Sequence, residues 1–192
     1  MVSSRALYLA LVGAFYAERL LELAVSSRNL RRLRARGGVE HGRGHYGATV
    51  AFHALYPAAA ALEVLALARR FPGAVGWAAL TLVALAQALR WWCVATLGGR
   101  WTTRVVVVPG LAPVTSGPYR WLRHPNYLAV EVEAWALPLV HGAWLTAIAA
   151  GTLNALLLAV RIRAEERALG PGWRAAFGRR PRPGAAPERP GA

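Results

Sequence analysis

The sequence predicts an all-α integral membrane protein with about five transmembrane helices. Three observations support this fold class: 56% of the 192 residues are apolar, the apolar residues gather in long runs, and arginines fill the segments between the runs. A helix needs about 20 apolar residues to cross a bilayer, and the cytoplasmic ends of spans are rich in basic residues. The chain therefore has the pattern of a small helical bundle embedded in a bilayer.

The apolar runs define the expected spans. The fourth run is short, and only His141 and Gly142 separate it from the fifth, so these two are expected to form a tight helical hairpin. A Pro/Gly/Arg-rich segment at 179–192 is expected to be disordered, which leaves 1–178 as a single membrane-embedded domain. In chain order the expected spans cover about 7–25, 46–68, 75–97, 127–140 and 143–160.

The formal net charge is +14, and every basic residue is an arginine. A strongly basic chain can bind nucleic acid, but these arginines flank apolar runs, so we expect a lipid bilayer and no nucleic acid as the partner. The arginine-rich segments follow the first, third and fifth runs, which places the N-terminus outside and the C-terminus in the cytoplasm. Arginine-only usage with much Ala and Gly is typical of a GC-rich bacterium, so the expected location is a bacterial inner membrane.

Charged and polar residues inside the first two runs have two interpretations. Glu18, Arg19 and Glu22 lie close together on one helix, and His53 lies within the second run. Such charges in a membrane usually pair with one another or mark a substrate site. Glu18, Arg19 and Glu22 are either a buried ion-paired staple between helices or part of a substrate-binding site. His53 is either a hydrogen-bonded packing residue or part of that same site. No metal is expected, because His45 and His53 share a helix face without a carboxylate.

Two polar islands adjoin the last two runs, at Gly117–Tyr127 and Arg161–Glu166. Proline is tolerated in the first turn of a helix, and the free N–H groups there attract anions. Arg161 and Glu165 are four residues apart, so they share a helix face. A hairpin would bring both islands together as an anion site, a guanidinium and a carboxylate. That combination suits a zwitterionic cofactor and an anionic substrate.

Two further glutamates lie in the fourth run, at Glu131 and Glu133. Residues two apart on a helix point in different directions, so at most one of them can face the core. Glu131 lies one turn beyond Tyr127 and is the expected cofactor-side residue.

The motif Gly-Pro-Tyr-Arg-x-x-Arg-His-Pro-x-Tyr, followed by an apolar hairpin and Arg-x-x-x-Glu-Glu, resembles the isoprenylcysteine carboxyl methyltransferase family. The resemblance implies an integral-membrane methyltransferase that uses S-adenosylmethionine (SAM) and has no Rossmann domain. It implies that Glu165 holds the polar end of the cofactor and that Arg161 is the catalytic residue that binds the substrate. Leu111–Val114 lacks a histidine found in eukaryotic members. The other implied cofactor residues are Tyr119, His124, Pro125, Asn126 and Tyr127.

Motifs in the N-terminal half resemble one bacterial branch of this family. Glu18-Arg19-Leu20-x-Glu22-Leu23, Ser27-Arg28-Asn29, Glu40-His41 and His45-Tyr46 resemble bacterial members that O-methylate long-chain alkylpyrones made by type III polyketide synthases. This resemblance implies O-methylation of a lipophilic small-molecule acceptor, and we expect Glu18, Glu22 and His53 to bind that acceptor. Three alternatives stay open: an isoprenylcysteine-like acceptor, a membrane reductase that binds NADPH in a similar hairpin, and a scaffold without activity.

Overall fold

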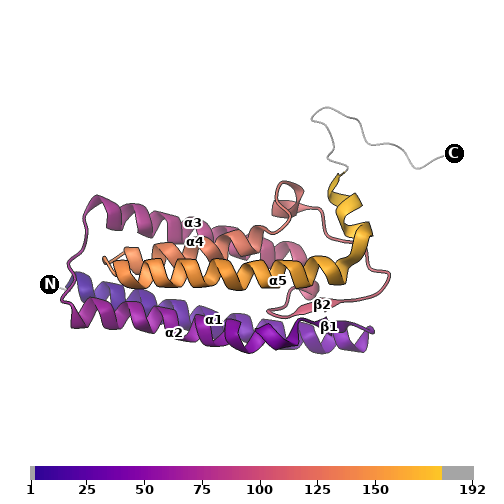
Figure 1. Ribbon diagram of the computed structural model, residues 1–192, viewed down its shortest axis with the longest axis horizontal. Coiled ribbons are helices and arrows are strands. Elements are labelled where there is room, and N and C mark those ends of the chain that lie inside the picture. Colours follow the sequence, from indigo (N-terminus) through magenta and orange to yellow (C-terminus); the bar gives the residue numbers. More distant parts are fainter. Residues whose placement is uncertain (1–2, 179–192) are drawn as a thin grey trace.

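The structure, a computed structural model, describes residues 3–178, so the expected tail at 179–192 lies outside it. The described part is mostly helical, and its one sheet is a short two-stranded ribbon, which confirms the predicted all-α class (Figure 1). Its long elements are α1 (Ser4–Ala35), α2 (Arg43–Ala66), α3 (Ala74–Leu97), α4 (Pro125–Leu139) and α5 (Trp144–Gly178).

Three of these helices are long and apolar enough to cross a membrane, which confirms a membrane protein. The candidate spans are Arg43–Ala66, Ala74–Arg100 and Trp144–Gly170. The apolar part of α1 carries Glu18, Arg19 and Glu22, and α4 has only 15 residues. Fifteen residues rise about 22 Å, which is shorter than the hydrocarbon core of a bilayer. The count of five spans therefore stays a prediction.

Two helices continue beyond the expected spans. α1 runs on through the arginine-rich segment to Ala35, and α5 runs on to Gly178 across a break at Gly170, where φ is 71°. Arginine, glutamate and alanine are good helix formers, so the helix persists after the apolar run ends. Hydropathy marks the expected membrane boundary and does not mark the end of the helix.

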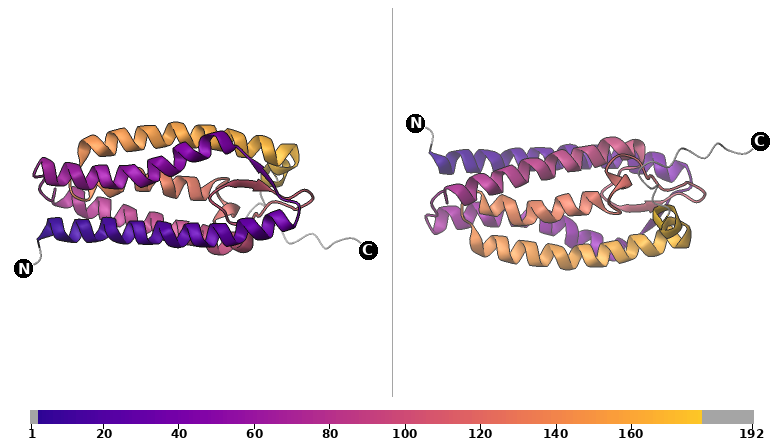
Figure 2. Two further views of the ribbon diagram at one scale, coloured as in Figure 1. Left: turned by 90° about the horizontal axis from the view of Figure 1, so that it is seen from below. Right: turned by 90° about the horizontal axis from the view of Figure 1, so that it is seen from above.

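The helices lie roughly parallel in one bundle, with α4 packed against both α3 and α5 (Figures 1 and 2). α2 packs on α5, and α1 on α2. An aromatic group from α1 and α2 fills the core: Phe52 stacks on Tyr56 at 4.9 Å, and Phe15 meets Tyr56 edge-on at 6.0 Å. The tight turn at Gly142 (φ 73°) joins α4 to α5.

One end of the bundle carries the start of α1, the α2–α3 link and the α4–α5 turn (Figure 1). Glu63 fastens this end, because its carboxylate accepts hydrogen bonds from the backbone N–H of Leu145 and Thr146 and from Arg69. The N–H groups of a first helical turn have no partner within the helix. Glu63 of α2 thus caps α5 from a neighbouring helix.

The opposite end gathers the short elements. β1 (Val39–His41) pairs antiparallel with β2 (Val105–Val107), with Glu40 opposite Val106. Two 3₁₀ turns, η1 (Gly98–Arg100) and η2 (Gly117–Arg120), lie between α3 and α4. The beginning of α4 and the C-terminal part of α5 reach the same end (Figures 1 and 2). Both polar islands therefore lie at one end of the bundle.

Glu40 ties the ribbon to the helices. Its side chain is only 3% exposed and accepts hydrogen bonds from Arg34 at 2.7 Å and Arg104 at 2.5 Å. Arg104 also lies over the ring of Tyr46, at 4.0 Å from the centroid. Burial of the Glu40 carboxyl raises its pKa, but the hydrogen bonds from Arg104 and Arg34 outweigh burial and hold the pKa below its usual value. Glu40 is therefore ionised at neutral pH.

Candidate active site

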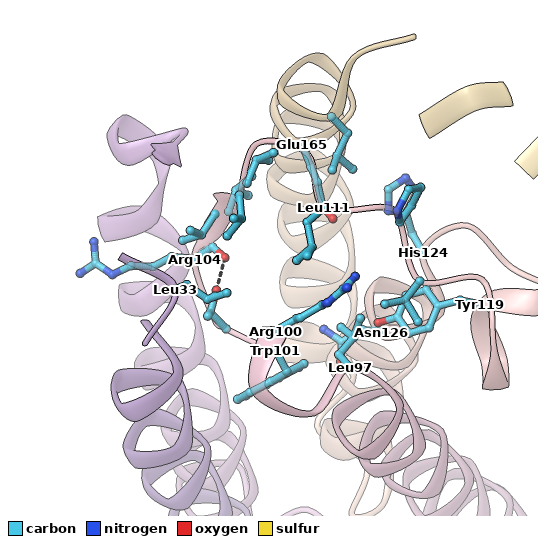
Figure 3. A pocket seen from close by; sticks show the side chains of 18 of the residues that line it. Leu33, Leu97, Arg100, Trp101, Arg104, Leu111, Tyr119, His124, Asn126 and Glu165 are labelled. Atoms are coloured by element: carbon cyan, nitrogen blue, oxygen red, sulfur yellow. Dashed lines mark hydrogen bonds between the residues drawn. The ribbon is translucent and has the colours of Figure 1, made fainter. Parts of the chain in front are cut away.

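A cavity opens at the end of the bundle where the polar islands meet (Figure 3). Its walls come from the ends of α1, α3 and α5, the start of α4, the β2 strand and the loop that follows it. Pro125 is fully buried at the first position of α4 and does not line this cavity, in contrast to the expectation. The other expected cofactor residues do line it, together with Arg161: Tyr119, His124, Asn126, Tyr127 and Glu165.

Tyr127 connects the two polar islands. Its hydroxyl donates to Glu165, and Arg161 Nε donates to the same hydroxyl oxygen at 2.9 Å. The ring of His124 stacks on Tyr127 at 5.4 Å, and His124 Nε2 lies 3.4 Å from Glu166 Oε1. α4 and α5 pack side by side, so the start of one helix meets the far part of the other. The spacing of Arg161 and Glu165 places both within reach of one tyrosine.

Tyr119 stands on the η2 side of the cavity (Figure 3). Burial raises the pKa of its hydroxyl far above the usual range, and the Cys93 thiol and the Glu165 carboxylate raise it further. The hydroxyl therefore keeps its proton at every physiological pH and can act as a hydrogen-bond donor.

Arg161 is 8% exposed, and its Nη2 donates to the carbonyl oxygen of Thr103 at 2.6 Å. Among the side chains that the structure describes, no carboxylate lies within 4.0 Å of its guanidinium. A buried charge is costly unless it is paired. The phenol of Tyr127 and the Thr103 carbonyl compensate this charge only in part, so the position favours an additional anion.

A second cavity of about 460 Å³ lies deeper in the bundle, and its volume is in the range of small-molecule sites. Residues of α1 and α2 form one side, and several are exposed toward the outside of the bundle, among them Leu20 (67%) and Val50 (42%). α4 and α5 contribute Val130 and Leu158. The two cavities share five lining residues: Trp101, Thr102, Asn126, Tyr127 and Arg161.

Of the three residues in the N-terminal half that are predicted to bind the acceptor, His53 and Glu22 line this second cavity, and Glu18 lines neither cavity. The Nδ1 atom of His53 is buried and has no hydrogen-bond partner among the described residues. Asn126 Oδ1, at the boundary of the two cavities, is also buried and without a hydrogen-bond partner among the described residues. Unpartnered buried polar atoms are unusual in folded proteins, so both atoms are suited to contact a ligand.

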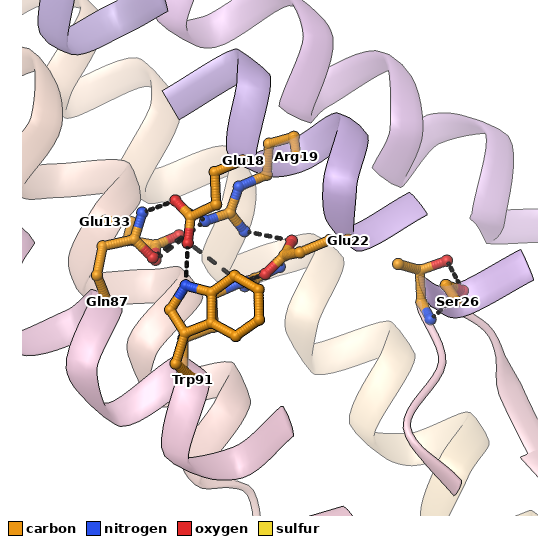
Figure 4. Close-up of polar contacts among 9 residues, drawn as sticks. Glu18, Arg19, Glu22, Ser26, Gln87, Trp91 and Glu133 are labelled. Carbon is orange, nitrogen blue, oxygen red and sulfur yellow. Dashed lines mark hydrogen bonds and ion pairs between the residues drawn. The ribbon is translucent and has the colours of Figure 1, made fainter. Parts of the chain in front are cut away.

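The charged residues of α1 form a network with α3 and α4 (Figure 4). Arg19 Nη1 donates to Glu22 at 2.9 Å, and Arg19 Nη2 lies 3.4 Å from Glu133, whose side chain is 1% exposed. Arg90 of α3 binds both carboxylate oxygens of Glu22, with Nη2 at 2.6 Å from Oε2. This network is the staple between helices that we considered for Glu18, Arg19 and Glu22.

Glu18 has a packing role in this network. Its carboxylate accepts hydrogen bonds from Gln87 and from Trp91 Nε1, both on α3 (Figure 4). Its place outside both cavities differs from the acceptor-binding role expected for it. Sequence reasoning missed Gln87 and Arg90, because their partners lie on another helix and no local spacing relates them.

Glu131 also differs from the expectation. Its carboxylate accepts hydrogen bonds from Asn154 at 2.7 Å and from Trp135 at 2.8 Å, and it lines neither cavity. Glu131 and Tyr127 share the side of α4 that meets α5, but one turn separates them by about 5–6 Å. Glu131 therefore lies one turn farther from the polar cavity than Tyr127. Of the two glutamates, Glu133 is the one that faces the core. Within residues 3–178 the structure shows no cluster of metal-ligating side chains.

These observations define a helical membrane protein with a polar cavity at one end that joins an apolar cavity within the bundle. A family model described as the isoprenylcysteine carboxyl methyltransferase (ICMT) family matches residues 79–171, which contain both polar islands. The chain belongs to this family. It is therefore a membrane methyltransferase by family, and methyltransferases of this family generally use SAM.

The chain also resembles two bacterial proteins. YpbQ of Bacillus subtilis (strain 168), described as uncharacterised, is 37% identical over 160 residues, which are 83% of this chain and 94% of YpbQ. An uncharacterised protein of Haemophilus influenzae is 28% identical over 154 residues, which are 80% of this chain and 89% of that protein. No solved structure matches the chain.

Proposed function

We propose that the protein transfers a methyl group from SAM to an anionic oxygen of a lipophilic acceptor, and we favour a long-chain alkylpyrone as that acceptor. One observation carries the proposal: Arg161, a buried cation without a carboxylate partner among the described side chains, borders both the polar and the apolar cavity. A cation at that junction suits an acceptor whose head is anionic and whose tail is apolar.

The residues of the polar cavity fit SAM. The Glu165 carboxylate, held by the Tyr127 hydroxyl, can bind the cofactor's ammonium group. The buried, unpartnered Oδ1 of Asn126 offers a further acceptor, and the protonated Tyr119 hydroxyl a donor. Bound SAM supplies the methyl group from a sulfonium cation. His124, stacked on Tyr127, adds an aromatic wall to the same cavity.

The apolar cavity fits the acceptor's tail. Leu20, Leu23, Val50 and Ala54 border this cavity and are exposed on the outside of α1 and α2, so a hydrocarbon chain can pass between these helices into the bilayer. Each buried methylene contributes roughly 0.8 kcal/mol. A lipophilic acceptor thus enters from the membrane, and water-soluble SAM enters from the cytoplasmic end.

Arg161 has the central role in this proposal. A guanidinium grips an anionic oxygen with two donors in a fixed plane. An enolate or a carboxylate is already ionised near neutral pH, so the step requires no strong general base. Rate then comes mainly from holding two reactants in line, which can supply roughly 7–11 kcal/mol. The name of the family keeps a second acceptor open, the carboxylate of an isoprenylcysteine, which has the same combination of anion and tail.

A titration of purified, detergent-solubilised protein with SAM and with NADPH tests the cofactor assignment. We expect SAM to bind and NADPH not to bind. Glu165→Gln should weaken SAM binding by about 1–3 kcal/mol, because it removes a charged hydrogen-bond partner. Glu131→Gln is the matched control, since Glu131 lies outside both cavities, and it should bind SAM normally. Binding of NADPH, or unchanged SAM affinity in folded Glu165→Gln protein, would overturn the assignment.

A further inference from the structure

Four arginines line the polar cavity, although SAM carries only one negatively charged group. They are Arg100, Arg104, Arg123 and Arg161. Opposite charges attract strongly where water is partly excluded, so the arginine that faces the cofactor carboxylate affects how SAM is oriented. The structure distinguishes these arginines by the partners that each already has.

Arg104 has a carboxylate partner of its own, because its Nη1 lies 2.5 Å from Glu40 and its guanidinium covers Tyr46. Arg161 directs Nε to Tyr127 and Nη2 to the Thr103 carbonyl, and it borders the apolar cavity. Arg123 is exposed and also interacts within the protein. None of these three combines a central position in the polar cavity with a guanidinium bound only to a neutral group.

Arg100 has that combination. It is the last residue of η1, directly after α3, and its side chain extends into the middle of the cavity, between Arg104 on one side and Tyr119 and His124 on the other (Figure 3). Its Nη1 donates to the Ala112 carbonyl at 2.7 Å. Among the described side chains no carboxylate lies within 4.0 Å of it.

We propose that Arg100 binds the carboxylate of SAM. The inference rests on the proposed function and assigns the two anions of the reaction to two arginines: the cofactor carboxylate to Arg100 and the acceptor oxygen to Arg161. The cofactor's ammonium group remains with Glu165. A guanidinium matches a carboxylate with two parallel N–H donors, so Arg100 fixes one end of the cofactor while Glu165 fixes the charge beside it.

The alternative is that Arg100 only supports the loop after β2 through its hydrogen bond to Ala112. The two roles differ in their response to decarboxylated SAM, which keeps the ammonium and sulfonium groups and lacks the carboxylate. If Arg100 binds the carboxylate, wild-type protein should prefer SAM over decarboxylated SAM by at least about tenfold in Kd. Arg100→Gln should lose most of that preference, because it weakens SAM binding and leaves decarboxylated SAM nearly unaffected. Arg100→Lys should keep part of it.

Calorimetric titration of the full-length protein in detergent with both cofactors gives these affinities without an activity assay. Arg120→Gln is the matched control. Arg120 is exposed on the η2 turn and lies outside the polar cavity, and its substitution removes the same charge from the same end of the molecule. It should keep the wild-type preference. A loss of preference in Arg120→Gln as large as in Arg100→Gln would show a general effect of net charge and overturn the assignment.

Two further results would also overturn it. Equal weakening of both cofactors in folded Arg100→Gln protein would mean that Arg100 acts only through the loop. Loss of the preference in Arg161→Lys, with the preference intact in Arg100→Gln, would assign the carboxylate to Arg161. If wild-type protein binds neither SAM nor decarboxylated SAM, the proposed function itself fails, and that result is distinguishable from these two.

Discussion

Arg161 is the cationic side chain that borders both cavities, and it is held from two sides by Tyr127 and the Thr103 carbonyl. Its neighbour on the same helix face, Glu165, is bound to the same tyrosine. A residue with this placement can orient the acceptor close to the cofactor. The alternative is a structural role, in which Arg161 only ties Tyr127 to the Thr103 carbonyl through its two hydrogen bonds.

Substitution Arg161→Lys separates these two roles. Lysine keeps the charge but loses the planar pair of donors. We expect turnover to fall by at least about tenfold, which corresponds to roughly 1.4 kcal/mol of barrier, while SAM affinity stays close to that of the wild type. Steady-state kinetics and a SAM titration measure the two quantities. Turnover close to wild type in the folded variant would rule out the orienting role.

At the residue scale, the family resemblance supplied most of the expected site residues, and helix spacing placed Arg161 and Glu165 on one face. The two islands gave Tyr119, His124, Asn126, Tyr127, Arg161 and Glu165, and the structure brings these residues to one cavity. Pro125, Glu18 and Glu131 lie elsewhere, because spacing along a helix gives the direction of a side chain and not its depth in the bundle. Arg100 could not be recognised, since its relation to the cavity depends on a loop that folds back through Ala112.

At the scale of elements, the β1–β2 ribbon covers one side of the polar cavity, and Glu40 connects it to α1 and to Arg104. This ribbon could not be predicted from the sequence, because each strand has only three residues and the two strands are more than 60 positions apart. Each apolar run lies within one of the long helices or overlaps it, but α1 and α5 continue well beyond the runs. Only the α1 members of the charged network, Arg19 and Glu22, could be recognised in the sequence. Their partners Arg90 on α3 and Glu133 on α4 are distant in sequence.

The ribbon contact predicts a pH dependence of stability. The pKa of Glu40 is lower in the folded protein than its ordinary value of 4.5, so its stabilising effect is complete above that value. The effect is lost as the pH falls through the lower pKa of the folded state. We expect Glu40→Gln to lower stability by only about 1 kcal/mol at pH 7, because solvent weakens the contacts of Glu40 with Arg34 and with Arg43, which lies 3.6 Å from its carboxylate; their side chains are 51% and 73% exposed.

Thermal unfolding of both proteins in detergent between pH 3 and pH 7 checks this expectation. The difference between wild type and Glu40→Gln should begin to shrink below about pH 4.5, where the unfolded chain takes up the proton, and should disappear below the lower pKa of the folded protein. A difference that stays constant over the whole range would mean that the charge of Glu40 does not stabilise the ribbon. Arg36→Gln, on an exposed residue outside the Glu40 contacts, serves as the control.

At the scale of the whole molecule, the polar and arginine-rich segments gather at one end of the bundle. The cavity, the ribbon and the arginine-rich parts of α1 and α5 lie at one end, and the α2–α3 link and the α4–α5 turn at the other (Figure 1). The excess of arginines at the cavity end favours a cytoplasmic location for that end. SAM is made in the cytoplasm, so this orientation would also give the cavity access to the proposed cofactor.

The orientation leads to a topology prediction with five spans and the N-terminus outside. Reporter fusions should place Gly37 and the C-terminus in the cytoplasm and His141 outside. The count of five depends on whether α1, which pairs its charges within the bundle, and the short α4 both cross the bilayer. If Gly37 and the C-terminus were found on opposite sides of the membrane, the count of five spans would be wrong.

The central claim is methyl transfer from SAM to an anionic head that carries a long apolar tail. The most direct test offers purified enzyme SAM with a labelled methyl group and two acceptor series, alkylpyrones and isoprenylcysteine derivatives of graded chain length. We expect labelled product, with kcat/KM rising with chain length because each buried methylene adds roughly 0.8 kcal/mol, and with pyrones preferred. A preference for the isoprenylcysteine series would change the acceptor and keep the reaction. Transfer only to short, water-soluble acceptors, or to none in either series, would contradict the claim.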